Sequence, residues 1–121
     1  MAVINNLPQK GGASGDAETF SGTFSTGWTY EAVKVGRVVN IHFSRNTTWT
    51  PSQWSTQSIG TLPSELFPAF MQLIPMQNKG YNWATGVIMV RISTDGVVNF
   101  GMRDATSLES PNAIGTYISA S

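Results

Sequence analysis

The sequence predicts an all-β protein: an antiparallel β-sandwich or barrel of about eight short strands with Greek-key, jelly-roll-like connections. Three observations carry this prediction. Apolar and polar residues alternate over short runs, turn residues recur about every 8–12 residues, and no long segment has the spacing of an amphipathic helix. At 121 residues the chain is expected to form one domain that folds without a disulfide or a structural metal.

The N-terminal segment, residues 1–16, is expected to be a flexible arm or a connection to another part of an assembly. It contains Gly11, Gly12 and Gly15 and has little apolar content. Pro8 has no backbone N–H to donate, so this segment cannot supply a central strand. We therefore expect the β-domain to span residues 17–121.

Alternation begins at Thr19 and continues, after a break at Gly27, through a predicted hairpin with a tight turn over residues 35–38. The second strand of this hairpin is expected over residues 38–44. In the first strand of the hairpin, alternate residues share one face: Trp28, Tyr30, Ala32 and Lys34. In the second strand Val39, Ile41 and Phe43 share one face. Asn40 and His42 lie on the outward face of that second strand.

The remaining predicted elements outside the central hairpin are two polar loops, a turn and three strands. Residues 46–58 form the predicted loop, and Pro63 presets the backbone angle of a turn at Pro63-Ser64-Glu65. We expect further strands over residues 58–62, 70–76 and 114–118, and a second polar loop over residues 104–112.

The strongest local prediction is a hairpin over residues 85–103, closed by Thr94-Asp95-Gly96. Such a loop makes a type I turn followed by a left-handed residue, which glycine adopts without a Cβ penalty. The turn sets the register, so Ile92 is expected to face Val98 toward the core. The pairs Ser93–Val97, Val90–Phe100 and Ile88–Met102 follow from the same register.

The opposite face of this hairpin is mixed, and two interpretations are open. It is a subunit interface or a ligand surface, or else an ordinary half-exposed sheet. Its members are Val87, Met89, Arg91, Asn99, Gly101 and Arg103.

Composition excludes several classes of protein and site. Seven Lys and Arg residues balance seven Asp and Glu residues and form no basic patch, which argues against nucleic-acid binding. The absence of cysteine excludes a thiolate metal site, and the single histidine, His42, cannot hold a metal alone, so no cofactor is expected. No apolar run reaches membrane-spanning length, and no secretory signal pattern is present. Charged residues make up 12%, which suits either a surface covered by partner subunits or a weakly charged solvated domain.

Four segments in this order carry a family resemblance: VKVGRVVNIHF from Val33, IGTLPSELFP from Ile59, GVIMVRISTDGVVNF from Gly86, and IGTYISAS from Ile114. Together they resemble the head domain of bacteriophage receptor-binding and tail-fibre proteins of the lactococcal siphophage type. The resemblance implies a compact antiparallel β-barrel or sandwich, a homotrimer, and a place in the phage tail or baseplate of the virion. It also implies recognition of a host cell-wall saccharide near the subunit boundaries, with the N-terminal arm as a contact to other tail proteins.

The resemblance places the family's receptor-site positions at Met89, Arg91, Phe100 or Gly101, and Asn112, where most residue types differ from the family's. Sugar recognition needs an aromatic or apolar face and a few polar groups that bond hydroxyls. We expect the site near the end of the barrel where the loop tryptophans approach the loop over residues 104–112. The candidate saccharide-binding residues are Trp49, Trp54, Tyr81, Trp83, Arg91, Arg103, Asp104 and Asn112.

The same residues allow other interpretations than a saccharide-binding head domain. Each loop tryptophan could instead cover the core or contact another subunit, because buried aromatic side chains dominate core and interface energetics. The sequence contains no nucleophile elbow, phosphate loop or partnered catalytic histidine, so we expect no enzyme, although Glu31, Asp104 and Glu109 could meet in space. A structural virion protein without a sugar site and a trimeric binding module outside any virus are the other candidates.

Overall fold

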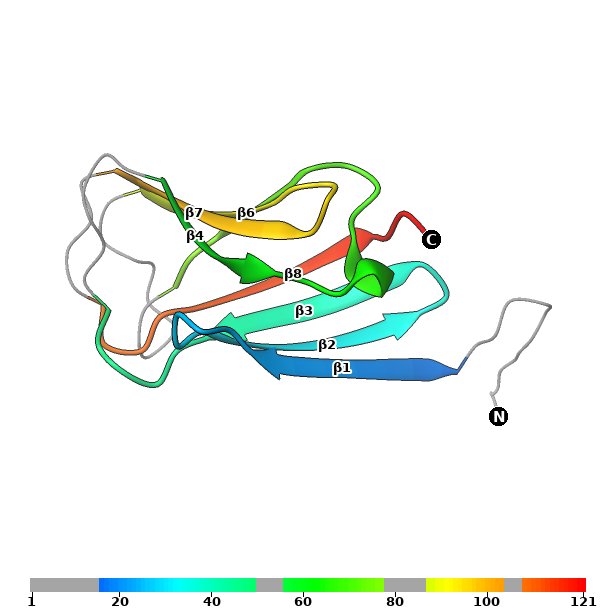
Figure 1. Ribbon diagram of the computed structural model, residues 1–121, viewed down its shortest axis with the longest axis horizontal. Coiled ribbons are helices and arrows are strands. Elements are labelled where there is room, and N and C mark those ends of the chain that lie inside the picture. Colours follow the sequence, from blue (N-terminus) through cyan, green and yellow to red (C-terminus); the bar gives the residue numbers. More distant parts are fainter. Residues whose placement is uncertain (1–15, 50–55, 78–86, 104–107) are drawn as a thin grey trace.

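The computed structural model describes residues 16–49, 56–77, 87–103 and 108–121. These residues form two four-stranded antiparallel sheets that pack face to face as a β-sandwich (Figure 1), which confirms the predicted fold class. The elements are β1 (Ala17–Thr23), β2 (Thr29–Val35), β3 (Val38–Ser44), β4 (Thr56–Thr61), the 3₁₀ turn η1 (Ser64–Leu66), β5 (Gln72–Pro75), β6 (Val87–Ile92), β7 (Val97–Arg103) and β8 (Asn112–Ile118).

The first sheet has the strand order β1-β2-β3-β8 and buries the alternate residues that the sequence predicts. The turn between β2 and β3 includes Gly36, whose φ of 61° lies in the left-handed region, and Val35 pairs with Val38 across it. Strand β8 then pairs with β3, so segments far apart in the sequence lie side by side. The buried residues of this sheet are Tyr30, Ala32, Lys34, Val39, Ile41, Phe43, Ala113 and Tyr117.

The second sheet has the order β4-β7-β6-β5, which is a Greek key because β5, β6 and β7 follow one another while β4 lies beside β7. Its central hairpin has the predicted register, with Ile92 opposite Val98 and Val90 opposite Phe100. All four of these side chains are fully buried. The turn is closed by the N–H of Gly96, which donates to the carbonyl of Ser93 at 2.8 Å, and the φ of Gly96 is 82°.

The core between the sheets is organised around three aromatic side chains. The ring of Trp28 meets the rings of Phe100 and Trp49 edge-on, with centroids 4.5 and 5.3 Å apart, and Trp49 meets Phe100 at 5.1 Å. Edge-to-face contacts at these distances add to the stabilisation that burial of the rings already gives. Trp49 reaches the core because its backbone forms an isolated antiparallel bridge with Leu108.

Several predicted boundaries are wrong by a few residues. Strand β4 begins at Thr56 rather than at residue 58, and β8 begins at Asn112 rather than at residue 114. Strand β5 covers Gln72–Pro75 rather than residues 70–76, because the chain just before it is held elsewhere: the N–H of Ala69 donates to the carbonyl of Ile118 at 2.9 Å.

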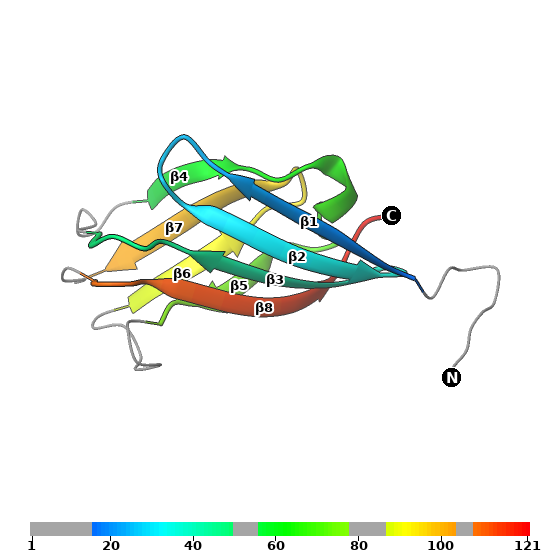
Figure 2. The ribbon, with the colours of Figure 1, turned by 90° about the horizontal axis from the view of Figure 1, so that it is seen from below.

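The two ends of the sandwich differ. At one end lie the start of β1, the turn between β2 and β3, η1 and the C-terminus (Figures 1 and 2). At the same end Lys34, although it lies on the core face, directs its ammonium group to the carbonyl of Glu65 in η1, with Nζ 2.8 Å from the oxygen. At the other end lie the described residues that adjoin segments 50–55, 78–86 and 104–107.

Candidate functional site

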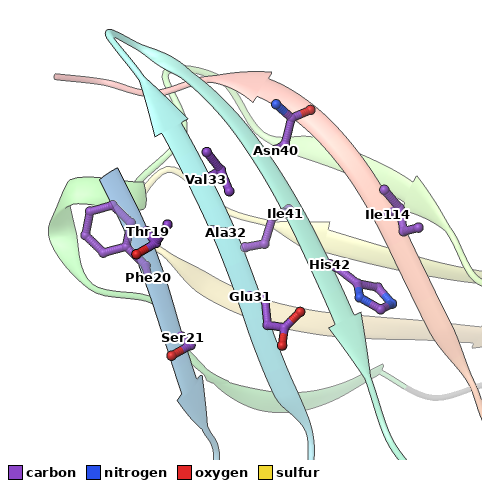
Figure 3. Close-up of a pocket in the computed structure, with 10 residues that line it drawn as sticks. All are labelled: Thr19, Phe20, Ser21, Glu31, Ala32, Val33, Asn40, Ile41, His42 and Ile114. Carbon is purple, nitrogen blue, oxygen red and sulfur yellow. The ribbon is translucent and has the colours of Figure 1, made fainter. Parts of the chain in front are cut away.

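The outer face of the first sheet contains a depression of about 470 Å³. Figure 3 shows the residues that line it, which come from all four strands of the sheet. Phe20, Ala32 and Ile41 belong to the core side of their strands, so the floor of the depression is the backbone of the sheet itself. The side chains on the outer face around it are Thr19, Ser21, Glu31, Val33, Asn40, His42 and Ile114.

The strand registers arrange these outer side chains in two neighbouring rows. In one row Ser21 pairs with Glu31, Glu31 with His42, and His42 with Ile114. In the other row Thr19 pairs with Val33, Val33 with Asn40, and Asn40 with Thr116. Directly opposed side chains lie about 4.5–5.5 Å apart at Cβ, so each row forms a continuous band across the sheet.

The polar groups of the depression include donors and acceptors. The hydroxyl of Thr116 donates to Oδ1 of Asn40 at 2.6 Å, which fixes the side-chain amide and leaves its nitrogen available as a donor. Glu31 is exposed and supplies carboxylate oxygens as acceptors, and the half-buried His42 supplies an imidazole beside it. A ligand with several hydroxyl groups would find both kinds of partner here.

Apolar side chains border these polar groups. Val33 is 39% exposed and Ile114 is 62% exposed, and they lie in different rows on different strands. A ring that presents C–H groups on one face and hydroxyl groups at its edge matches such a mixed surface. The volume of the depression falls within the roughly 300–1,000 Å³ that is usual for sites of small organic ligands.

The outer face of the second sheet has a smaller hollow of about 100 Å³ beside Arg91, lined also by Thr56, Leu73, Met89 and Gly101. The face is mixed, as the hairpin pattern predicts. Nε of Arg91 is buried and has no hydrogen-bond partner among the described residues, which leaves one donor unsatisfied. Three of the positions to which the resemblance points, Met89, Arg91 and Gly101, therefore do come together. The hollow has only about a fifth of the volume of the depression on the first sheet.

The other predicted site residues do not form one cluster in the described structure. Trp49 is 5% exposed and belongs to the core, which is the alternative interpretation of the loop tryptophans, so its ring is not open to a ligand. Asn112 exchanges two backbone hydrogen bonds with Gln77 and belongs to the first sheet, whereas Arg91 belongs to the second. Trp54, Tyr81, Trp83, Asp104 and the side chain of Arg103 lie outside the described residues.

The depression is not among the sites that the sequence predicts. The sequence predicts Glu31 only as a possible catalytic carboxylate, and it predicts Asn40 and His42 on an outward face without a binding role. One sequence signal could have indicated part of the depression. The tight turn at residues 35–38 places Val33 opposite Asn40 and Glu31 opposite His42. The pairing of β8 with β3, which adds Ile114 and Thr116, has no comparable local signal.

No known family model matches the sequence, and a search of curated proteins finds no match. In residues 16–49, 56–77, 87–103 and 108–121 no three His, Cys, Asp or Glu side chains are grouped so that they could hold a metal ion. The same ranges contain no helix that is long and apolar enough to cross a membrane.

Proposed function

We propose that this chain is the receptor-binding head domain of a phage tail or baseplate, and that it binds a host cell-surface saccharide as a homotrimer. It performs no chemistry on the saccharide in this proposal. The observation that carries the proposal is the depression on the first sheet, where Glu31, Asn40 and His42 lie beside Val33 and Ile114. The phage context and the number of subunits rest on the family resemblance of the sequence.

The depression supports saccharide binding better than the hollow at Arg91 does. It is several times larger, it has both donors and acceptors, and it has exposed apolar side chains on two strands. Each hydrogen bond to an exposed hydroxyl would add only about 0.5–1.5 kcal/mol, because water already satisfies these groups. Three linked sites in a trimer compensate through effective concentration, which raises avidity without any new contact.

A structural virion protein without a sugar site is the second candidate. The observation that favours it is the amount of apolar surface: eight large hydrophobic side chains are exposed in the described structure, among them Phe70 at 75%. Exposed apolar surface of this kind marks contacts with other proteins. This candidate and the receptor-binding proposal differ in whether the domain binds host envelope.

The test is binding of the intact protein to host cell-envelope fractions and to a glycan array. Glu31→Gln and Asn40→Ala should each weaken binding to the soluble saccharide roughly 3- to 10-fold, the loss expected for one hydrogen bond. Glu65→Gln is the matched control, because Glu65 is also an exposed carboxylate but lies in η1, outside the depression.

Two results would contradict the proposal in different ways. If Arg91→Ala abolishes binding while Glu31→Gln and Asn40→Ala leave it unchanged, the saccharide site lies on the second sheet. If the wild-type protein binds no envelope fraction at all, the structural-protein candidate is correct. Trp54→Ala and Trp83→Ala extend the test to the predicted site residues outside the described structure, where we expect weaker binding and a nearly unchanged melting temperature.

A further inference from the structure

We propose that the depression on the first sheet selects saccharides that carry a free amino group, through an ion pair between the ammonium and the carboxylate of Glu31. The same saccharides with N-acetylated amines should bind less tightly. The inference rests on the proposed function, because it names the class of saccharide that the same depression binds. It follows from the charges in and around this face of the sheet.

Glu31 is the only carboxylate among the described residues that line the depression. His42, directly opposite, is the one other ionisable residue of this lining, and no lysine or arginine belongs to it. The rows of side chains that flank the depression, from Ala17 to Ile118 and from Thr23 to Asn112, contain no ionisable residue either. Near neutral pH a carboxylate is ionised, whereas an imidazole is mostly neutral. The charge of Glu31 therefore sets the sign of the field on this face.

The basic side chains of this region are engaged elsewhere. Each of the three that lie in the first sheet or next to it donates a hydrogen bond to a backbone carbonyl outside the depression: Lys34 to Glu65 at 2.8 Å, Arg37 to Ser119 at 2.8 Å and Arg45 to Thr26 at 3.0 Å. Glu31 itself makes no hydrogen bond or ion pair with another described residue. Its carboxylate is thus an unpaired negative charge in a concave surface, where the field of a charge is focused.

The polar neighbours of Glu31 suit the rest of a sugar. Figure 3 shows Glu31 between Ser21 and His42, with Asn40 two residues along the strand that carries His42. Asn40 is therefore a diagonal neighbour of Glu31, at a spacing of about 7–8 Å. Its amide nitrogen is free to donate, because the oxygen accepts from Thr116. A sugar with its ammonium at Glu31 can place a hydroxyl at this amide.

Two other kinds of ligand match the depression less well. An acidic saccharide would bring a carboxylate or a phosphate to the charge of Glu31 and would find no cationic side chain in the described lining. A lysine side chain of a protein partner would pair with Glu31 and cover Val33 or Ile114, but would leave the amide of Asn40 without a partner. An amino sugar satisfies all three features, because it has an ammonium, apolar C–H groups and hydroxyls.

The expected preference for the amino form is small, because Glu31 is exposed. An ion pair between exposed groups is expected to change the affinity roughly 3- to 5-fold, and salt screens it. Glutamine in place of Glu31 keeps the shape and one acceptor oxygen but removes the charge. The preference for the amino form, rather than binding itself, is therefore the property that depends on the charge.

The test compares two saccharides that differ only at nitrogen: glucosamine oligosaccharides with free amino groups, and N-acetylglucosamine oligosaccharides of the same length. Dissociation constants are measured for the full-length protein at neutral pH. We expect the wild-type protein to bind the amino form roughly 3- to 5-fold more tightly at low salt and to lose this preference at high salt. Glu31→Gln should bind both forms equally. Glu65→Gln is the matched control, because it removes the same charge outside the depression, and it should keep the wild-type preference.

The host saccharide is tested in the same way, before and after its amino groups are acetylated. Acetylation should weaken binding to the wild-type protein and leave binding to Glu31→Gln unchanged. The inference is overturned if the wild-type protein shows no preference for the amino form in either comparison, if the preference survives in Glu31→Gln, or if Glu65→Gln removes it equally.

The two proposals can fail independently. If the host saccharide binds at the depression and acetylation changes nothing, the receptor-binding function stands and the preference for amino groups is rejected. If the amino oligosaccharides bind with a preference that depends on Glu31 but no envelope fraction binds, the preference stands and the receptor-binding function is rejected.

Discussion

Glu31 lies directly opposite His42 on the outer face of the first sheet, in the middle of a row that runs from Ser21 to Ile114. The two side chains come from neighbouring strands joined by a tight turn, so their placement depends on a local hairpin rather than on a long-range contact. A carboxylate and an imidazole therefore lie side by side in the depression, next to the exposed apolar side chains of Val33 and Ile114. That is why we place ligand binding there.

The three aromatic rings at the centre of the core predict a large effect of a single substitution on the free energy of unfolding. Phe100 is fully buried against Trp28 and Trp49, so Phe100→Ala removes apolar contacts and leaves a cavity. We expect a loss of about 3–5 kcal/mol in the free energy of unfolding, measured by urea denaturation. Leu73→Ala, at a position 56% exposed, should change it by less than about 0.5 kcal/mol. Equal effects of the two substitutions would contradict the assignment of Phe100 to the core.

The burial of Trp49 predicts that this residue supports folding and not saccharide binding. Trp49→Ala should lower the free energy of unfolding by about 3–5 kcal/mol, while the affinity of the remaining folded protein for saccharide stays unchanged. Denaturation and binding assays on the same variant check this. A stable variant with weakened binding would mean that the ring is exposed to the ligand.

Gly36 and Gly96 both lie in hairpin turns, but only Gly96 has another side chain packed close to its Cα. Substituting each by alanine therefore separates the cost of that close packing from the cost of the turn conformation. Both have positive φ, 61° at Gly36 and 82° at Gly96, so alanine is conformationally strained at either position. A Cβ at Gly36 would meet nothing, whereas a Cβ at Gly96 would collide with the ring of Phe67. We expect Gly36→Ala to cost about 1 kcal/mol and Gly96→Ala to cost clearly more, as measured by thermal denaturation. A larger cost at Gly36 would contradict the packing of Phe67 over the hairpin turn.

The phenol of Tyr117 predicts how stability changes at alkaline pH. Burial raises its pKa well above the ordinary value of 10.0, and the hydroxyl donates to the carbonyl of Leu66 at 2.7 Å. Above pH 10 the unfolded chain releases this proton while the folded protein keeps it, so the free energy of unfolding falls as pH rises. Tyr117→Phe should lose about 1–3 kcal/mol at neutral pH because the buried carbonyl loses its donor.

The alkaline decrease caused by Tyr117 should be absent from the Tyr117→Phe variant. The measurement is urea denaturation of both proteins between neutral pH and about pH 11, a range that covers the ordinary pKa of tyrosine. If the decrease is equally steep in both proteins, Tyr117 is not the group responsible.

Local signals account for the parts of the fold that the sequence predicts correctly. The register of Ile92 with Val98 follows from a short turn that contains Gly96, and the faces of β2 and β3 follow from strict alternation. Trp49 could not be placed this way, because its burial depends on a bridge to Leu108, far away in the chain. Phe70 continues an alternating pattern, but a hydrogen bond from Ala69 to the last residue of β8 keeps it out of β5.

The residues of the depression likewise divide into those with a local sequence signal and those without one. Four of the seven outer-face side chains of the depression, Glu31, Val33, Asn40 and His42, follow from one hairpin. Thr19 and Ser21 come from β1, which precedes β2 directly, whereas Ile114 depends on the pairing of β8 with β3, strands so far apart in sequence that no local pattern predicts their contact. Three of the four positions suggested by the resemblance fall on the second sheet, and the fourth, Asn112, is in the first sheet but does not line the depression.

The position at which a host saccharide contacts the protein tests binding at the depression most directly. Titration of isotopically labelled protein with solubilised host cell-wall saccharide, followed by amide chemical shifts, measures this without any substitution. We predict the largest shifts at Thr19, Ser21, Glu31, Asn40, His42 and Ile114, with saturation at high saccharide concentration. Shifts confined to the second sheet around Arg91, or no shifts at any concentration, would contradict saccharide binding at the depression of the first sheet.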